Sequence, residues 1–332
     1  MLSTPPSRRA LRVGGLCAAS VLVIWTSFIL VARFSAAQTL LPFDIAWLRY
    51  AFSGLVALPI ALLRWPALVN GLAGPGGSPQ RAFLRGTVLA MLAGIGYCLL
   101  AYSGFFFAPA AHAAVLLPGS LPLWTALLAS LWLGERLTRG RAAGLALIAL
   151  GGLLVGGSSL WLAFSGGDTW RGDLLFLSAS LCWASYGVLC RRWRVGAVDA
   201  TLAIALGCLL AYVPLYAAAA WAGWVPSRLG QAPLNEILFH AVFQGGLSML
   251  VAGWAYTQVV QTFGPVRTTM LTALVPPLAA LLAVPVLGEP LGAAALGGLA
   301  CVTLGLVIGV RAAAPAARRQ SSAANTVQRV MP

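Results

Sequence analysis

Ten apolar segments follow one another along this chain, separated by short breaks that are charged or rich in glycine and proline. Each has about the length of a bilayer-spanning helix, which needs roughly 20 predominantly apolar residues. The segments are residues 13–32, 45–63, 86–107, 109–133, 142–161, 173–190, 200–221, 237–260, 265–287 and 291–310. The sequence therefore predicts an all-α polytopic membrane protein with ten transmembrane helices.

The amino-acid composition excludes a soluble fold. Of the 332 residues, 60% are hydrophobic and only 8% are charged, and the mean hydropathy is +0.89. Soluble domains carry roughly a quarter charged residues. A transmembrane β-barrel needs segments of alternating polarity. Stretches such as residues 144–157 do not alternate, so a barrel is not expected.

The arginines orient the predicted helices. They collect on the cytoplasmic side of membrane proteins, and with a cytoplasmic N-terminus all but four of the 21 fall on that side. This explains the net charge of +14 without a nucleic-acid partner. We expect both termini in the cytoplasm, with a cytoplasmic segment at residues 1–12 and a disordered tail at residues 312–332. The four exceptions are Arg33, Arg49, Arg171 and Arg228.

The chain contains an internal duplication. Residues 121–137, LPLWTALLASLWLGERL, match residues 275–291, VPPLAALLAVPVLGEPL, at nine of 17 positions. Near the start of each half, WTSF at residues 25–28 matches WASY at residues 183–186. Further matches recur at spacings of 154 to 158 residues, so the duplication covers nearly all of the membrane region.

The two repeats cover residues 13–161 and 172–311 and hold five helices each. An odd number of crossings places the second repeat upside down, and inverted repeats with proline-interrupted helices are typical of secondary transporters. The fourth helix of each repeat is rich in proline, and Pro122 of the first matches Pro276 of the second. Such interrupted helices are expected to face a cavity. The alternative is that these prolines only shape helix packing.

Two of the three glutamates, Glu135 and Glu289, occupy the same place in the two repeats. The inversion puts them at opposite membrane faces, roughly 30 Å apart, so they cannot form a paired acid site. Each follows a glycine that can end a helix. We expect each carboxylate to cap the helix that comes next, where it suits the positive end of the helix dipole.

Glycines spaced four apart occur in the last helix of each repeat, as Gly152-x-x-x-Gly156 and Gly305-x-x-x-Gly309. Small residues at this spacing let membrane helices approach closely. Packing within the bundle is the first interpretation, and a homodimer contact through helices 5 and 10 is the second.

Together these features resemble the drug/metabolite transporter (DMT) superfamily, and more specifically its EamA-type exporters. The resemblance is carried by Trp-x-Ser-aromatic in helices 1 and 6, by "P…LLA…LGE" closing helices 4 and 9, and by the five-plus-five inverted repeat. It implies metabolite efflux across a bacterial inner membrane by alternating access, with amino acids, related metabolites or drugs as substrates. It also implies that helices 1, 3, 4, 6, 8 and 9 line a central cavity.

Polar and aromatic residues within the spans are the candidate substrate-binding residues, because polar groups in a membrane are costly and usually functional. Arg49 either reaches the interface or attracts a substrate carboxylate. His112 is either a neutral imidazole bonded to a neighbour or a proton-linked switch, since histidine changes charge near neutral pH. Gln244 precedes Gly245-Gly246, which would let a ligand approach the backbone. The candidates are Trp25, Ser27, Arg49, Tyr97, Tyr102, His112, Trp183, Tyr186, Gln244 and Tyr256.

The acidic residues argue against a carboxylate relay at mid-membrane, because the remaining ones are expected at helix ends or in loops. Facilitated diffusion and coupling through His112 both remain open. These acidic residues are Asp44, Asp168, Asp173, Asp199 and Glu236.

Other function classes fit the sequence less well. An intramembrane enzyme needs a catalytic set such as H-E-x-x-H or paired aspartates, and a channel needs a filter motif. The sequence shows neither, and its six cysteines have no metal-ligand spacing. No cofactor or metal is therefore expected. A lipid or nucleotide-sugar translocator of the same fold is the alternative, but it should need several cavity arginines where Arg49 alone is available.

Overall fold

The computed structural model describes residues 8–135, 137–263 and 265–330. Within these residues, ten helices are long and apolar enough to cross a membrane. The all-α, ten-span prediction is confirmed, and the spans are called membrane helices 1 to 10 below. Residues 1–7 of the predicted N-terminal segment, and Arg136 of the cytoplasmic arginines, lie outside the described residues.

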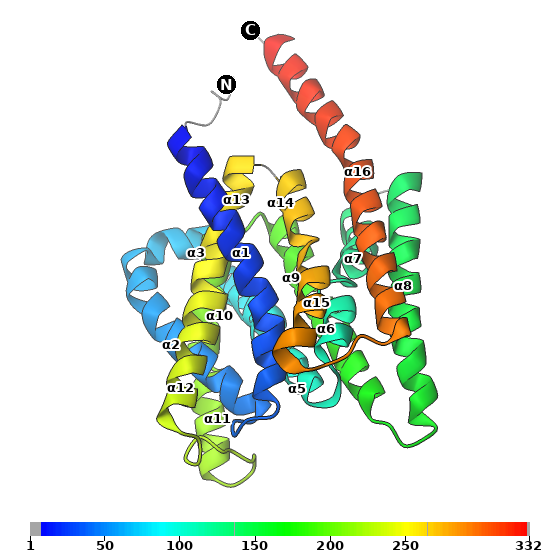
Figure 1. Ribbon diagram of the computed structural model, residues 1–332. Helices are drawn as coiled ribbons and strands as arrows, with labels where there is room; N and C mark the ends of the chain where they lie inside the picture. Colours follow the sequence, from blue (N-terminus) through cyan, green and yellow to red (C-terminus); the bar gives the residue numbers. More distant parts are fainter. Residues whose placement is uncertain (1–7, 136, 264, 331–332) are drawn as a thin grey trace.

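Several spans are built from more than one helical element, and Figure 1 labels most of these elements. Membrane helix 3 combines α4, η1 and α5, and membrane helix 4 combines α6 and α7. Their counterparts in the second repeat are divided in a similar way. The first repeat contains α1 (Arg8–Ser35), α2 (Pro42–Leu63), α3 (Trp65–Ala73), α4 (Pro79–Leu89), η1 (Ala90–Gly96), α5 (Tyr97–Phe107), α6 (Ala110–Leu116), α7 (Leu121–Leu133) and α8 (Arg139–Ala163). The second contains α9 (Thr169–Trp193), α10 (Ala197–Leu210), α11 (Tyr212–Trp221), α12 (Leu234–His240), η2 (Ala241–Val251), α13 (Ala252–Phe263), α14 (Pro265–Thr272), α15 (Val275–Leu287) and α16 (Ala293–Val330).

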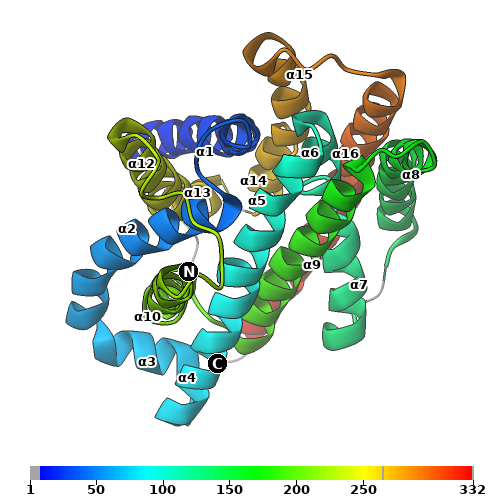
Figure 2. The same cartoon turned by 90° about the horizontal axis from the view of Figure 1, so that it is seen from below.

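The spans form one bundle in which α5 and α9 run through the middle (Figure 2). In this view α2, α3, α4, α10 and α12 lie on one side of them, and α7 and α8 lie on the other. In Figure 1, α1 begins and α16 ends at the same end of the bundle, called the terminal end below. This agrees with an even number of crossings.

The fourth helix of each repeat is broken at the same place. In membrane helix 4 the break separates α6 from α7 and contains Pro118, and in membrane helix 9 it separates α14 from α15. A proline follows within the first two positions of both α7 and α15. Both helices then end on a glycine in the left-handed conformation, Gly134 and Gly288, each with φ of 68°. The predicted glycine ends are therefore confirmed.

The third helix of each repeat contains a π-helical segment at a matching position, η1 and η2. A π turn widens the helix locally and occurs frequently at functional sites. In both helices it lies just before the α-helical part that carries a matched tyrosine, Tyr102 in α5 and Tyr256 in α13. The duplication of this irregularity indicates that it belongs to the fold of each repeat.

Membrane helices 5 and 10 pack against each other through glycines. A Cβ atom added to Gly144 would lie 2.6 Å from the Gly305 carbonyl oxygen, and one added to Gly151 would lie 2.6 Å from that of Gly298. Packing within the bundle is thus correct for Gly305, but the close contacts fall on glycines seven residues apart, and nothing lies within 4 Å of a Cβ added to Gly156 or Gly309. The homodimer contact stays a prediction.

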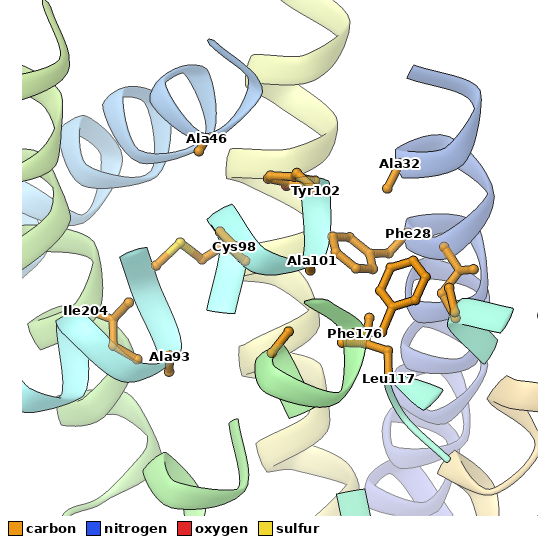
Figure 3. Packing of buried hydrophobic residues seen from close by; sticks show 14 of the residues in the cluster. Phe28, Ala32, Ala46, Ala93, Cys98, Ala101, Tyr102, Leu117, Phe176 and Ile204 are labelled. Atoms are coloured by element: carbon orange, nitrogen blue, oxygen red, sulfur yellow. The ribbon is translucent and has the colours of Figure 1, made fainter. Parts of the chain in front are cut away.

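Aromatic side chains of α1, α5 and α9 meet in the hydrophobic core. Figure 3 shows Phe28, Tyr102 and Phe176 gathered there. Phe105 links them, with its ring centroid 6.5 Å from that of Phe28 and 4.9 Å from that of Phe176. Much of the surrounding core is alanine, which lets membrane helices approach closely. These contacts fix the three helices that carry much of the site.

Two segments outside the spans are helical. The glycine- and proline-rich stretch at residues 70–80 begins inside α3, whose last carbonyls accept hydrogen bonds from Arg85 Nη1 at 2.9 and 3.1 Å. The predicted disordered tail at residues 312–332 is helical as far as Val330, in one piece with α16. Alanine has the highest helix propensity, and this segment holds several.

Candidate substrate cavity

The candidate substrate site is a cavity between the two repeats. Its lining comes from membrane helices 1, 3, 4, 6, 8 and 9, which are the helices that the family resemblance implies, and from helix 2 through Arg49. Apolar and aromatic side chains predominate. The lining residues are Trp25, Phe28, Ile29, Arg49, Tyr97, Leu117, Pro118, Leu121, Ser180, Trp183, Ser248 and Val275.

Arg49 is the charged residue of this lining, and it is only 6% exposed. Its Nη1 donates to Ser248 Oγ at 3.3 Å, to Gln244 Oε1 at 3.4 Å and to Tyr102 Oη at 3.5 Å. Its guanidinium also lies 5.9 Å from the centroid of the Phe28 ring. Among the described residues, its Nε has no hydrogen-bond partner and no carboxylate forms an ion pair with it.

The interpretation that Arg49 reaches the membrane interface is therefore wrong. Gly245 and Gly246 explain why the residue is buried instead. A Cβ on Gly245 would lie 2.7 Å from the Arg49 carbonyl oxygen, and one on Gly246 would lie 3.2 Å from the Phe52 ring. The two glycines serve the close approach of α2 to η2, so the expectation that they admit a ligand to the backbone is also wrong.

Aromatic groups form two walls of the cavity, each built on one of two tryptophans. Trp25 of α1 stacks on Tyr256 with 5.3 Å between ring centroids. Trp183 of α9 lies 4.8 Å from Tyr97 and 5.3 Å from Tyr186. The two tryptophans are the matched residues of the duplication, so the repeat supplies a similar wall from each half.

The structure sorts the ten sequence candidates into three groups. Two of them, Ser27 and His112, are not part of the lining that the structure describes. Four stand directly behind lining residues, namely Tyr102, Tyr186, Gln244 and Tyr256. Four line the cavity, namely Trp25, Arg49, Tyr97 and Trp183.

His112 instead faces Asp173 of α9. His112 Nδ1 lies 2.9 Å from Asp173 Oδ1 and 3.4 Å from Ser159 Oγ. Asp173 was expected at a helix end, but it lies in the second turn of α9 and is only 4% exposed. Among the described residues, this pair has no third ligand with which it could hold a metal ion.

Sequence reasoning missed several lining residues because they carry no unusual chemistry. Ser248 lies one helical turn after Gln244, and Ser180 lies about one turn before Trp183. Helical spacing from a recognised candidate was therefore the available signal. Asp173 was missed because it follows Arg171 by two residues, and this charged break suggested a helix end.

Two ion pairs join the repeats at opposite ends of the bundle. At the terminal end, Arg191 of α9 donates to Glu135, which follows α7. At the other end, Arg33 of α1 donates to Glu289, which follows α15. The arginines are matched residues of the duplication, as are the glutamates. Each pair therefore links the first helix of one repeat to the fourth helix of the other.

This arrangement corrects the expectation that each glutamate caps the helix that follows it. Glu289 Oε2 accepts a hydrogen bond from the Ala110 N–H at 2.8 Å, at the start of α6 in the other repeat. The Thr138 side chain caps α8, accepting from the Arg141 N–H at 3.4 Å. Arginine attracts a carboxylate more strongly than backbone N–H groups do, because the arginine and the carboxylate carry opposite full charges.

Comparisons with known proteins agree with this architecture. A family model described as the EamA-like transporter family matches residues 12–157 and again residues 170–311. The "Uncharacterized transporter YyaM" of Bacillus subtilis (strain 168) is 28% identical over 232 residues, which are 66% of this chain and 70% of the relative. A solved structure described as "Crystal structure of protein" has a TM-score of 0.57 and 21% identity, and the match covers 89% of this chain and 96% of that one.

The last match shows a shared fold, and the family match falls once on each repeat. Together with the ten spans, these findings make the protein a multi-pass membrane protein of a transporter family. The chain belongs to the EamA-like transporter family of the drug/metabolite transporter superfamily.

Proposed function

We propose that this chain exports small amphipathic metabolites that carry a carboxylate, amino acids and related compounds first among them. One observation carries the proposal. Arg49 reaches the cavity from a buried position and forms no ion pair with a described carboxylate. A buried charge without a counter-charge is costly. A substrate carboxylate bound at Arg49 would supply the missing charge.

The cavity walls support an amphipathic substrate. The rings of Trp25, Tyr97 and Trp183 line the site, and aromatic walls with a few polar groups are typical of small-molecule sites. A substrate with its carboxylate at Arg49 would place its apolar part against these rings. The alternative, a lipid or nucleotide-sugar translocator, is disfavoured because phosphates call for several cations, whereas Arg49 is the single cation of the described lining.

Alternating access between the repeats is supported by the two matched ion pairs. Because each pair joins one repeat to the other at one end, that end can open only if its pair separates. Inverted repeats that rock against each other around a central site work in this way. The pairs are thus suited to close the cavity alternately at its two ends.

The arginine distribution supports a cytoplasmic terminal end. With this orientation in a bacterial inner membrane, the Arg191–Glu135 pair closes the cytoplasmic side, and the Arg33–Glu289 pair closes the opposite side. Export is the direction that the family resemblance implies.

The proposal is tested with purified protein in proteoliposomes. Counterflow of radiolabelled L-phenylalanine would be measured against unlabelled competitors, which avoids the need for each competitor to cross the membrane. We expect carboxylate-bearing amino acids to compete and L-phenylalanine amide, which lacks the carboxylate, to fail. Equal competition by the amide would contradict the role of Arg49. Absence of counterflow across a panel of amino acids, nucleosides and cationic drugs would overturn the transport proposal.

A further inference from the structure

Three membrane helices converge on a buried acid–base pair that lies outside the cavity. His112 of α6 and Asp173 of α9 are 2.9 Å apart, with side chains 14% and 5% exposed. Ser159 of α8 closes the third side, with its Oγ 3.4 Å from His112 Nδ1. Asp173 Oδ2 is buried and has no hydrogen-bond partner among the described residues.

The other charged groups near this pair are already matched with one another. Glu289, bonded to the Ala110 N–H at the start of α6, is paired with Arg33 of α1. At the start of α9, Asp168 is paired with Arg171 at 3.1 Å. The other elements that pack on α6, namely α5, α8, α15 and α16, add no charged residue facing His112 within the ion-pair distances found in the described chain.

Asp173 therefore has His112 as its single cationic partner among the described residues. A protonated His112 and an ionised Asp173 make a pair without net charge. Loss of one proton leaves a buried negative charge, which is costly within a membrane. A buried His–Asp pair is therefore chemically able to carry one proton, and a conformation that opens the pair to water would let that proton exchange.

The same two helices lead from the pair to the cavity. Two turns further along them, Ser120 at the start of α7 lies with its Oγ 3.0 Å from Ser180 Oγ of α9. Ser180 lines the cavity. A shift of α6 relative to α9 that follows proton loss would reach the cavity through this second contact and through the break between α6 and α7.

The pair occurs in one repeat only. The residues that match His112 and Asp173 in the duplication are Val266 and Gly15. A group needed merely to build the repeat would be expected twice, as are the broken helices and the Arg–Glu pairs. A proton-coupling site that opens to one side of the membrane needs to occur only once, near one end of the bundle. The single His–Asp pair meets this requirement.

We propose that His112 and Asp173 together form the proton-binding site through which this transporter is coupled to a proton gradient. The proposal rests on the proposed transport function and adds its energy source. Ser159 is a positioning residue for His112. The substrate cavity itself holds no part of the pair, so substrate translocation and proton coupling can be separated by mutation.

The transport test compares two assays of radiolabelled L-phenylalanine in proteoliposomes. Counterflow without a gradient measures translocation, and accumulation driven by a pH gradient measures coupling. We expect His112→Gln and Asp173→Asn to keep counterflow within about twofold while losing gradient-driven accumulation. The control is His240→Gln, since His240 is the second histidine and is also buried, 3.2 Å from Ser35 Oγ. Gradient-driven accumulation by Asp173→Asn at the wild-type level would overturn the proposal.

A second measurement does not depend on transport. With only two histidines in the chain, the His240→Gln protein carries His112 as its single native histidine, and its ring signals can be followed by NMR in lipid nanodiscs as the pH is changed. We expect Asp173→Asn to change that pH response. Identical curves with and without Asp173 would overturn the pair as a proton site. If the wild-type protein showed no counterflow while Asp173→Asn still changed the NMR response of His112, the result would count against the transport function alone.

Discussion

At the scale of single residues, burial gives Arg49 the surroundings that its proposed role in substrate recognition needs. Three neutral oxygens satisfy one of its terminal nitrogens, those of Tyr102, Gln244 and Ser248. Its Nε stays unpaired among the described residues. These neighbours hold the guanidinium in place without neutralising it, which leaves its charge available to a ligand.

We expect Arg49→Gln to raise the KM for L-phenylalanine counterflow by about tenfold or more. A hydrogen bond to a charged group contributes about 1.5–3 kcal/mol, and a tenfold change corresponds to about 1.4 kcal/mol. The KM of Arg49→Lys should lie between those of Arg49→Gln and the wild type, because lysine keeps the charge and loses the planar fork of donors. The exposed Arg228 offers the control, Arg228→Gln, which should leave the KM unchanged. Equal KM values for Arg49→Gln and wild type would refute the assignment.

The sequence identified Arg49 and His112 as unusual, because charged and titratable groups are rare in these spans. It could not predict what they touch. The partners of Arg49 come from α5 and η2, and the partner of His112 comes from the other repeat. Such contacts depend on how helices pack, which residue types alone do not specify. Ser27 was a candidate only by its place in the repeated Trp-x-Ser motif, and the described cavity lining does not include it.

At the scale of elements, glycines set how closely α8 and α16 pack. Gly144 and Gly151 each meet a backbone carbonyl of the opposite helix, so there is no room for a methyl group. Their matched residues, Gly298 and Gly305, provide the reciprocal half of the same contact. The duplication thus generates an antiparallel helix pair in which matched glycines make equivalent contacts from each helix.

We expect Gly151→Ala to destabilise the protein by about 1–3 kcal/mol, the usual cost of overpacking. The physical reason is the Gly298 carbonyl oxygen, 2.6 Å from the added carbon. The melting temperature of the purified protein in one detergent would measure it. Gly156→Ala is the matched control on the same helix, since nothing lies within 4 Å of its added carbon. Equal melting temperatures for the two variants would contradict the packing contact.

Element boundaries were predictable where the chain repeats them. The match between residues 121–137 and 275–291 led to equal ends for α7 and α15, and the glycine ends follow from the preference for glycine in the left-handed conformation. The π segments η1 and η2 were not predictable. Their sequences carry no proline or charge that would signal an irregular turn.

At the scale of the whole molecule, features that occur in both repeats differ in kind from those that occur once. The broken helices, the aromatic walls and the Arg–Glu pairs occur twice. Arg49 and the His112–Asp173 pair occur once. The repeated features are those that an alternating movement needs at both ends. The single features are those proposed to bind a substrate or a proton, for which one site is enough.

The matched ion pairs predict opposite effects from equivalent mutations. Glu289→Gln removes the charge that holds Arg33 and should favour opening at the end away from the termini, whereas Glu135→Gln should favour opening at the terminal end. Partly exposed pairs contribute about 0.2–1 kcal/mol, so each shift should be modest, about two- to fivefold in population. The effect of Glu289→Gln should be larger, because its pair is less exposed, at 18% and 29% against 33% and 53%.

Labelling of a cavity cysteine would measure these shifts. Ser180→Cys, in a protein whose six native cysteines are replaced, places a thiol in the cavity lining. An impermeant maleimide would be applied from one side in right-side-out vesicles and from the other in inverted vesicles. Glu289→Gln and Glu135→Gln should raise the labelling rate from opposite sides, and the double variant should return toward the wild-type ratio, because both ends are then weakened. If both single variants raised labelling from the same side, the two pairs would not act as alternate closures, and the equivalence of the two ends that the inverted repeat implies would fail for this molecule.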